Sequence, residues 1–190
     1  STSTWGSAET VSSGGLEHGF YWRGTATRDG KTIVFWTDTT TPTTIKYSIR
    51  SAGSGGTWSA AATAVTDLGA SQLSGFSCTS NLGSDDQVVF YYNDGTDLVY
   101  KLVDVGAATF GSKVVLVSSV GTLQGTCVQA PVSSVKKFGL MYQLANGKMM
   151  LATHTIAPLE VSSAGTLVSL NSDTYNSATQ ILTHIVRRGT

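Results

Sequence analysis

The sequence has little charge and no long basic segment, and this shortage bears on its possible partners. Its 190 residues include 12 Lys plus Arg and 12 Asp plus Glu, so the formal net charge at pH 7 is zero. Proteins that neutralise nucleic-acid phosphates need a basic surface. The basic clusters here are two short pairs, Lys136-Lys137 and Arg187-Arg188. We therefore expect no nucleic-acid partner.

Long apolar runs, secretion signals and glycosylation sequons are also lacking. No stretch approaches the roughly 20 apolar residues of a membrane-spanning helix. The opening residues Ser1 to Trp5 have neither the basic region nor the apolar core of a signal peptide. No Asn-x-Ser/Thr sequon occurs. Because Ser and Thr are abundant and Lys is scarce, we expect an extracellular or virion-surface protein without a membrane span.

What the chain has instead is the composition of a folded β protein. Apolar residues make up 41% of it, whereas disordered chains have low hydrophobicity and usually a high net charge. Glycine is frequent, with 21 residues against 3 prolines, which supplies turn positions. No segment shows a convincing 3.6-residue apolar period, so no helix is predicted.

A repeat of about 50 residues runs through the chain. Thr4-Trp5 recurs as Thr57-Trp58 and, with Phe for Trp, as Thr109-Phe110, at spacings of 53 and 52 residues. A second element recurs in phase, reading Thr-Ile-Val-Phe-Trp at 32–36, Gln-Val-Val-Phe-Tyr-Tyr at 87–92 and Lys-Phe-Gly-Leu-Met-Tyr at 137–142. Self-similarity at such a period indicates a repeat architecture.

Within the first repeat, alternating apolar and polar residues predict four strands. They cover 20–27, 32–37, 44–51 and a last one from 57 to about 65, with a turn at Arg28-Asp29-Gly30. Asn93-Asp94-Gly95 and Asn146-Gly147 predict hairpins at corresponding places in the next two repeats.

Four strands in about 50 residues, repeated in tandem, are typical of a β-propeller blade. We predict one all-β repeat domain with blades near 17–70, 72–122 and 123–172; a β-sandwich or jelly roll is the alternative. Segments 1–13 and 177–190 then supply outer and opening strands of an incomplete or shared blade. Open sheet edges are normally covered, so we expect a homo-oligomer, a larger surface assembly or a longer propeller to complete the ring.

Two cysteines, Cys78 and Cys127, are too few for a disulfide framework. They fall at similar places in successive repeats, which leaves a bridge open. Two small buried apolar residues are the simpler interpretation.

The turn before the predicted fourth strand reads Ser51-Ala-Gly-Ser-Gly55-Gly-Thr57-Trp58. It resembles the Asp-box hairpin of sialidase-like β-propellers, Ser-x-Asp-x-Gly-x-Thr-Trp. Ser51, Gly55, Thr57 and Trp58 match, whereas Gly53 replaces the Asp. The resemblance implies a structural hairpin on the outer rim of the fold, with its Trp packed between sheets and away from any central site.

A sialidase-like active site is not evident. The resemblance would require three arginines, a Tyr–Glu pair and an acidic catalyst, and only Tyr21-Trp22-Arg23-Gly24 faintly matches an early Arg motif of the family. A general glycosidase needs two facing carboxylates, but most carboxylates here lie beside Gly or Asn in turns. The histidines show no metal-ligand spacing, and Asn93–Asp97 reads better as a tight hairpin than as a calcium loop. We expect no catalysis, no cofactor and no metal.

Aromatic residues on the first two strands of each repeat are the remaining functional hint. Such side chains beside hydroxyls and amides suit sugar recognition; packing between sheets is the competing interpretation. The candidate glycan-binding residues are Tyr21, Trp22, Arg23, Trp36, Tyr91, Tyr92 and Tyr142. The sequence thus favours a non-catalytic surface or assembly component with a possible adhesion role, its partner a glycan or a receptor. A lectin-like glycan-binding module and a glycosidase of sialidase-like fold are the alternatives.

Overall fold

A computed structural model gives the fold. It describes residues 7–11, 22–38, 41, 43–69, 75–80, 86–120, 126–128, 137–143, 149–157, 160–164 and 168–169. In the third sheet, from residue 126 on, it describes the course of the backbone and little of the side chains. The predicted strand 20–27 therefore lies partly outside the described residues. Three other predicted features lie wholly outside them: the dipeptide Thr4-Trp5, the turn Asn146-Gly147 and the strand at 177–190.

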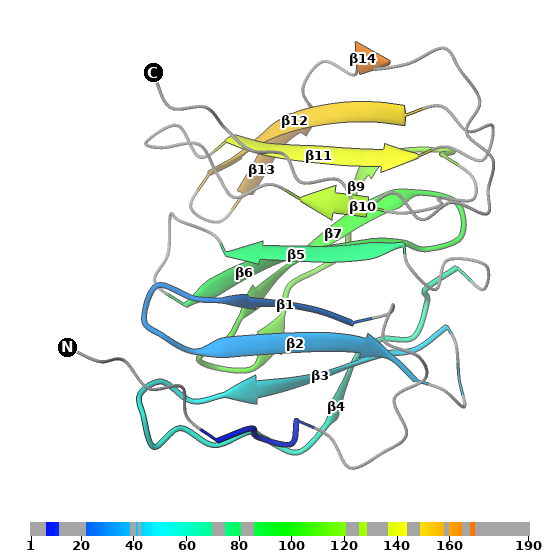
Figure 1. Cartoon of the computed structure of the whole chain (residues 1–190). Coiled ribbons are helices and arrows are strands. Elements are labelled where there is room, and N and C mark those ends of the chain that lie inside the picture. The colour runs from blue at the N-terminus through cyan, green and yellow to red at the C-terminus, as the bar shows by residue number, and fades with distance from the viewer. Residues whose placement is uncertain are drawn as a thin grey trace.

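The chain is all-β, and its described strands form three antiparallel sheets (Figure 1). The first has the order β1 (Trp22–Ala26), β2 (Thr32–Thr37), β3 (Ile45–Arg50) and β4 (Ala62–Val65). The second has β5 (Phe76–Ser80), β6 (Gln87–Asn93), β7 (Leu98–Asp104) and β8 (Thr109–Phe110), with β9 (Val114–Val117) also paired to β7. The third has β10 (Thr126–Val128), β11 (Lys137–Gln143), β12 (Met149–Ala157) and β13 (Glu160–Ala164), with β14 (Val168–Ser169) paired to β12.

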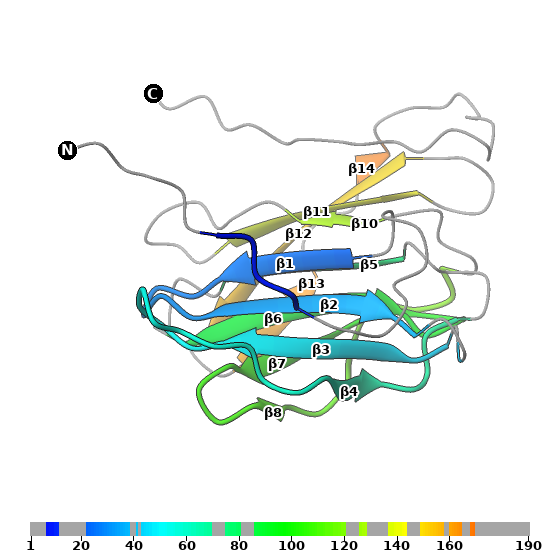
Figure 2. The same ribbon diagram turned by 60° about the horizontal axis from the view of Figure 1, so that its bottom comes forward.

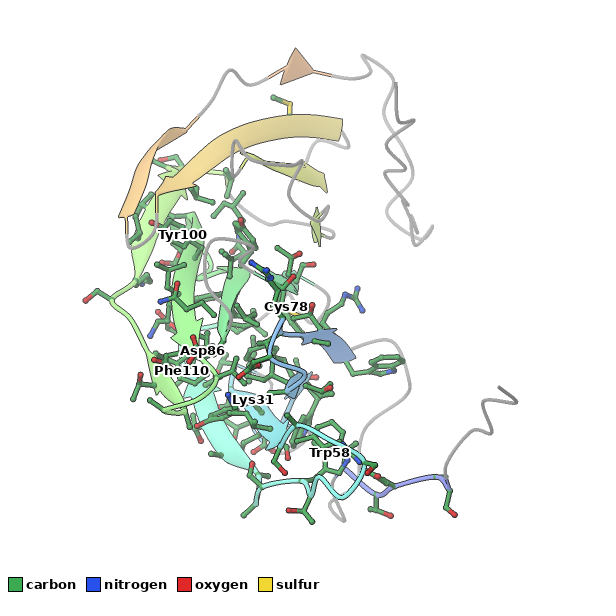
Figure 3. The ribbon with its side chains drawn as sticks, turned by 90° about the vertical axis from the view of Figure 1, so that its left-hand side faces the viewer. Lys31, Trp58, Cys78, Asp86, Tyr100 and Phe110 are labelled. Carbon is green, nitrogen blue, oxygen red and sulfur yellow. The ribbon has the colours of Figure 1, made fainter. Side chains whose placement is uncertain are left out.

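Each sheet is built from one of the predicted repeats, and the sheets follow one another in space as in sequence. The first strand of each sheet lies next to the first strand of the following sheet, since β5 contacts both β1 and β10. Seen from the side, the three sheets succeed one another along a curve (Figure 3). Among the described residues no helix is long and apolar enough to cross a membrane.

An aromatic cluster holds the first sheet against the second. Phe35 of β2 stacks on Phe90 of β6 with ring centroids 4.3 Å apart, and both are fully buried. Phe110 of β8 meets the edge of Phe35 and packs on Tyr47 of β3. Offset and edge-on ring contacts add to the stabilisation that burial alone gives. The core therefore lies between sheets, and neither sheet buries its apolar residues alone.

The second sheet repeats this pattern on its other face. Val89 and Tyr91 of β6 and Leu98 and Tyr100 of β7 are buried together, and Met150 of the third sheet packs against them. A sheet that is covered on both sides has apolar residues at successive positions. This explains why β6 is buried along nearly its whole length.

The repeat register differs by one residue from the sequence alignment along the second strand. Alignment of the Val-Phe-aromatic elements matches Phe35 with Phe90. In the structure Phe35 faces the following sheet, as Tyr91 does, whereas Phe90 faces the preceding one. Side-chain direction alternates along a strand, so a slip of one residue moves every side chain to the opposite face. The sequence alignment did not reveal this shift because Phe90, Tyr91 and Tyr92 are consecutive aromatic residues.

The Thr-Trp repeat, by contrast, keeps its register. Trp58 forms an isolated bridge with Arg50, and Phe110 pairs with Val103 at the corresponding place of the second sheet. In both sheets the outer strand then carries one extra residue, Ala64 opposite Ile45 and Lys46 of β3 in one and Leu116 opposite Leu98 and Val99 of β7 in the other. The outer segment is also divided in both sheets, between the Trp58 bridge and β4 in the first and between β8 and β9 in the second. The strand expected from residue 57 therefore begins at Ala62.

Two predicted turns are confirmed. Gly30 and Gly95 have φ values of +86° and +99°, a conformation that glycine adopts without steric cost. β2 has the predicted bounds, and β3 is one residue shorter at each end. Residues 7–11, which were expected to continue a strand, are not in a strand. They lie against the first sheet (dark blue in Figure 2), where Glu9 binds Arg50.

Candidate functional site

The hairpin that resembles an Asp-box is closed by its first and last residues. The Ser51 N–H donates to the Thr57 carbonyl at 3.1 Å, and the Thr57 N–H donates to Ser51 Oγ at 3.0 Å. Inside the turn, the Gly56 N–H donates to the Gly53 carbonyl at 3.1 Å. Ser51 and Thr57 therefore close the turn from both ends.

The motif matched Gly55, but the turn requires glycine at positions 53 and 56 instead. Gly53, which stands where the motif has Asp, has a φ of +89°. A Cβ on Gly56 would lie 2.1 Å from the Ser51 carbonyl oxygen, so no side chain fits there. Gly55 has free space around it and no left-handed φ. Gly56 was missed because it lies at a variable position of the motif.

An exposed ion pair connects this hairpin to the N-terminal segment. Arg50 Nε and Nη2 donate to the Glu9 carboxylate at 2.6 and 2.7 Å, and Trp58 also hydrogen-bonds to it. The hydrogen bond from Arg50 is the main cause that lowers the pKa of Glu9. Arg50 Nη1 further donates to the Gly53 carbonyl at 3.1 Å. Glu9 thus fixes Arg50 and Trp58 beside the turn.

Next to the hairpin lies an open pocket of about 540 Å³ between the first sheet and the β7–β8 turn of the second. One wall is apolar and aromatic, and its rim carries hydroxyl groups and one lysine. The lining residues are Lys31, Tyr47, Ile49, Ser51, Thr57, Trp58, Ser59, Ala60, Ala62, Val105, Gly106 and Ala108. Trp58 is half-buried in this wall, and Figure 3 shows it on the turn at the outer end of the first sheet.

Charged groups gather where Gly106 lines the pocket. Lys31 forms an ion pair with Asp29, which also accepts a hydrogen bond from the Thr27 hydroxyl. These bonds lower the pKa of Asp29, the one from Lys31 most. The hydrogen bond to Asp29 is likewise the main cause that raises the pKa of Lys31, with further attraction from Asp86 and Asp104.

The predicted glycan-binding aromatics fall into three groups. Trp22 of β1 is 55% exposed and Arg23 is half-buried, away from the pocket. Trp36, Tyr91 and Tyr92 are buried in the sheets, so in this conformation packing is their role and no ligand reaches them directly. Tyr21 and the side chain of Tyr142 lie outside the described residues.

Burial also changes the pKa of the two buried tyrosines of β6. It raises the pKa of Tyr91 and of Tyr92 well above the ordinary value for tyrosine. The nearby carboxylates of Asp67 and Asp94 raise that of Tyr92 further. Its hydroxyl is buried and makes no hydrogen bond of normal geometry to any described residue.

The acidic turn after β6 holds a lysine. Lys113 Nζ lies 2.9 Å from Asp67 Oδ2 and 2.8 Å from Asp94 Oδ2. Asp94 Oδ1 accepts backbone N–H groups of Thr96 and Asp97 at 3.2 and 2.9 Å. The turn between β6 and β7 is the tight hairpin that the sequence predicted.

Cys78 of β5 carries a free thiol. Burial raises its pKa to about 12, although part of the residue is exposed, so the thiol itself is the enclosed part. At such a pKa the reactive thiolate is scarce at neutral pH. Cys78 therefore fits the small apolar interpretation; the side chain of Cys127 lies outside the described residues.

No protein-family model matches this sequence, and no curated protein matches it either. Seven chains of solved structures are similar to it. One is a triple arginine-to-alanine mutant of AofleA from Arthrobotrys oligospora, at a TM-score of 0.56 and 13% identity. The match covers 83% of this chain and 43% of that one, so the chain spans less than half the length of this neighbour. At this identity the likeness supports the all-β fold alone.

Proposed function

We propose that this chain is a non-catalytic sugar-binding protein and that its ligand occupies the pocket beside Trp58. The observation that carries the proposal is the pocket itself, about 540 Å³ in volume, with Trp58 and Tyr47 in its wall and Ser51, Thr57 and Ser59 beside them. Small-molecule sites are concave, mostly apolar and of this size, with a few polar groups that fix orientation. An indole beside hydroxyl groups suits the two-sided chemistry of a sugar ring, which has apolar C–H faces and a polar rim.

The nearby carboxylates favour binding over catalysis. Asp29 is paired with Lys31 and Thr27, and Asp104 Oδ1 accepts the Ala107 N–H at 2.7 Å. Carboxylates with such turn bonds serve structural roles more often than catalytic ones. A panel of fluorogenic glycosides is the check on this part of the proposal, and measurable cleavage would favour the glycosidase alternative.

The three sheets are proposed to be blades of a β-propeller-like ring of the sialidase-like type. Support comes from the in-phase Trp58 and Phe110, the closed Ser51–Thr57 hairpin and the curved succession of sheets. The three substituted arginines of AofleA also recur at an interval of 53 residues, which is the spacing of Thr4-Trp5 and Thr57-Trp58 here. A ring of such blades places an inter-sheet pocket on its periphery.

Sugar binding is tested by titration calorimetry and a glycan array on the wild type and two tryptophan variants. Trp58→Ala removes the indole from the pocket and is expected to weaken binding about fivefold to thirtyfold, since stacking and burial of an aromatic ring contribute on the order of 1–2 kcal/mol. Trp22→Ala is the matched control, because Trp22 is exposed but does not line the pocket. Binding that survives Trp58→Ala and disappears with Trp22→Ala would move the site to β1.

A structural role in a surface assembly is the second candidate. The exposed Trp22 on β1 favours contact with another chain. An extracellular or virion-surface location belongs to the same proposal. Light scattering of the purified chain is expected to give a defined oligomer, and Trp22→Ser is expected to shift it toward the monomer. A monomer at all concentrations tested would remove this candidate.

A further inference from the structure

Trp58 and Phe110 occupy corresponding positions in the first two sheets but are held in different ways. The ring of Phe110 packs on Tyr47 of the preceding sheet, with ring centroids 4.9 Å apart. The indole of Trp58 instead hydrogen-bonds to the carboxylate of Glu9, which comes from the N-terminal segment 7–11. A tryptophan side chain has one hydrogen-bonding group, its indole N–H, so this bond fixes the direction of the ring.

Arg50 connects Glu9 to the turn that forms one wall of the pocket. Its Nε and Nη2 donate to the two carboxylate oxygens of Glu9 at 2.6 and 2.7 Å. Its Nη1 donates to the carbonyls of Ser51 and Gly53 in the turn, at 3.4 and 3.1 Å. An arginine–carboxylate pair with two bonds fixes orientation as well as distance. Glu9 therefore holds the guanidinium against the turn and the indole of Trp58 beside it.

We propose that Glu9 and Arg50 are positioning residues of the sugar site, and that the N-terminal segment 7–11 controls ligand affinity through the orientation of Trp58. This role rests on the proposed sugar-binding function and falls to two residues that do not line the pocket. A ring that turns freely has to be ordered when a ligand binds, which costs conformational entropy. With Glu9 in place the indole is oriented before the ligand arrives, so this cost is reduced.

The first test is titration calorimetry with the sugar that the wild type binds most tightly on the glycan array. Glu9→Ala is expected to weaken binding about threefold, the effect of ordering one side chain. Glu9→Gln keeps an oxygen that accepts the indole N–H and is expected to recover part of the affinity. The matched control is Lys46→Met, which removes the exposed ion pair of Lys46 with Asp38 from the same strand as Arg50. Lys46 does not line the pocket, so the affinity should not change.

A double-mutant cycle with Trp58 separates positioning from an independent effect of Glu9. In the Trp58→Ala background no indole is left to orient, so Glu9→Ala is expected to change the affinity by less than about 1.5-fold. An equal loss in both backgrounds would overturn the inference, because Glu9 would then act without Trp58.

The orientation of Trp58 is followed without a ligand through the indole N–H signals in a ¹⁵N–¹H spectrum of the full chain. The sequence has four tryptophans, and the signal that disappears in Trp58→Phe belongs to Trp58. Glu9→Ala is expected to move this signal and to leave those of Trp22 and Trp36 in place, whereas Lys46→Met should move none of the three. A Trp58 signal that stays unchanged in Glu9→Ala would show that the carboxylate does not orient the ring.

Two failures can be told apart. If Trp58→Ala weakens sugar binding but Glu9→Ala binds as tightly as the wild type, the positioning role is overturned while sugar binding stands. If the wild type binds no sugar at millimolar concentration, the proposed function is overturned, and the control of ligand affinity by Glu9 with it. The indole signals need no sugar and still decide whether Glu9 orients Trp58.

Discussion

Gly56 is the residue where local geometry leaves least freedom. Its ideal Cβ position is 2.1 Å from the Ser51 carbonyl, far inside contact distance, whereas Gly55 beside it has open space. Gly56→Ala is therefore expected to lower the free energy of unfolding by about 2–4 kcal/mol, the range for forced strain and lost turn bonds. Gly55→Ala is the matched control and should change it by less than about 1 kcal/mol. Urea denaturation measures both, and equal effects would contradict the steric argument.

Lys113 and Asp94 form the second residue-scale test. Burial opposes ionisation of Asp94, but hydrogen bonds from Lys113 and from the Asp97 and Thr96 N–H groups outweigh it and lower its pKa. A carboxyl with a depressed folded-state pKa stabilises the fold above its unfolded pKa and loses that contribution as the pH falls through the folded value. Stability is thus expected to fall below about pH 4, the ordinary Asp value.

Asp94→Asn and Lys113→Met are expected to flatten this acid loss when unfolding is measured from about pH 7 to pH 2. Asp29 and Glu9, whose pKa values are also lowered, keep part of the slope in both variants. Asp97→Asn leaves the ion pair of Lys113 with Asp94 intact and is the control. A slope that is the same in all three would show that the Lys113 pair contributes nothing.

At the scale of elements, the contact between the first two sheets depends on a few rings. Phe35 and Phe90 come from different sheets and are fully buried against each other. Phe35→Ala is expected to destabilise the protein by about 3–5 kcal/mol, because a large cavity opens in a packed interface. Phe35→Leu keeps more of the volume and should cost clearly less.

A double-mutant cycle with Phe90 separates the ring contact from the loss of volume. Two residues in direct contact are expected to show a coupling of about 0.5–1.5 kcal/mol, whereas distant residues add. Pairing Phe35→Ala with Leu98→Ala, on the other face of the second sheet, supplies the additive comparison. Coupling that is no larger for Phe90 than for Leu98 would argue against direct packing of the two sheets.

At the scale of the whole molecule, a ligand in the pocket touches both sheets at once. It would then stabilise the folded chain as a unit by mass action, by about 2.7 kcal/mol at a ligand concentration of 100 Kd. We expect a saturable rise of the melting temperature with the sugar that binds best, and a smaller rise for Trp58→Ala at the same sugar concentration. A ligand that raises the melting temperature of Trp58→Ala equally would bind elsewhere.

Much of the architecture was accessible from the sequence because strands and turns are set locally. Period-two alternation predicted β2 and β3, and Gly30 and Gly95 marked the turns that need a left-handed φ. The pocket was not accessible in this way. Its wall joins Trp58 to Gly106, residues far apart in sequence that become neighbours when two sheets pack.

The candidate aromatics show the same division. Trp36, Tyr91 and Tyr92 and the exposed Trp22 all look alike as aromatic residues on strands, but their exposure depends on which sheet covers them. The local residue pattern of a strand does not predict which side chains will be covered by a sheet about fifty residues later in the sequence. Burial therefore separated packing residues from accessible ones where composition could not.

By itself the sequence determined the all-β class, the repeat and the Ser51–Thr57 hairpin, because hydrophobic alternation and turn chemistry act over a few residues. The tertiary structure decided the register of the second strand of the repeat, the burial of Tyr91 and Tyr92, and the pocket whose lining joins Trp58 to Gly106. These depend on which faces of the sheets meet, and that is a property of packing between distant segments rather than of any one of them.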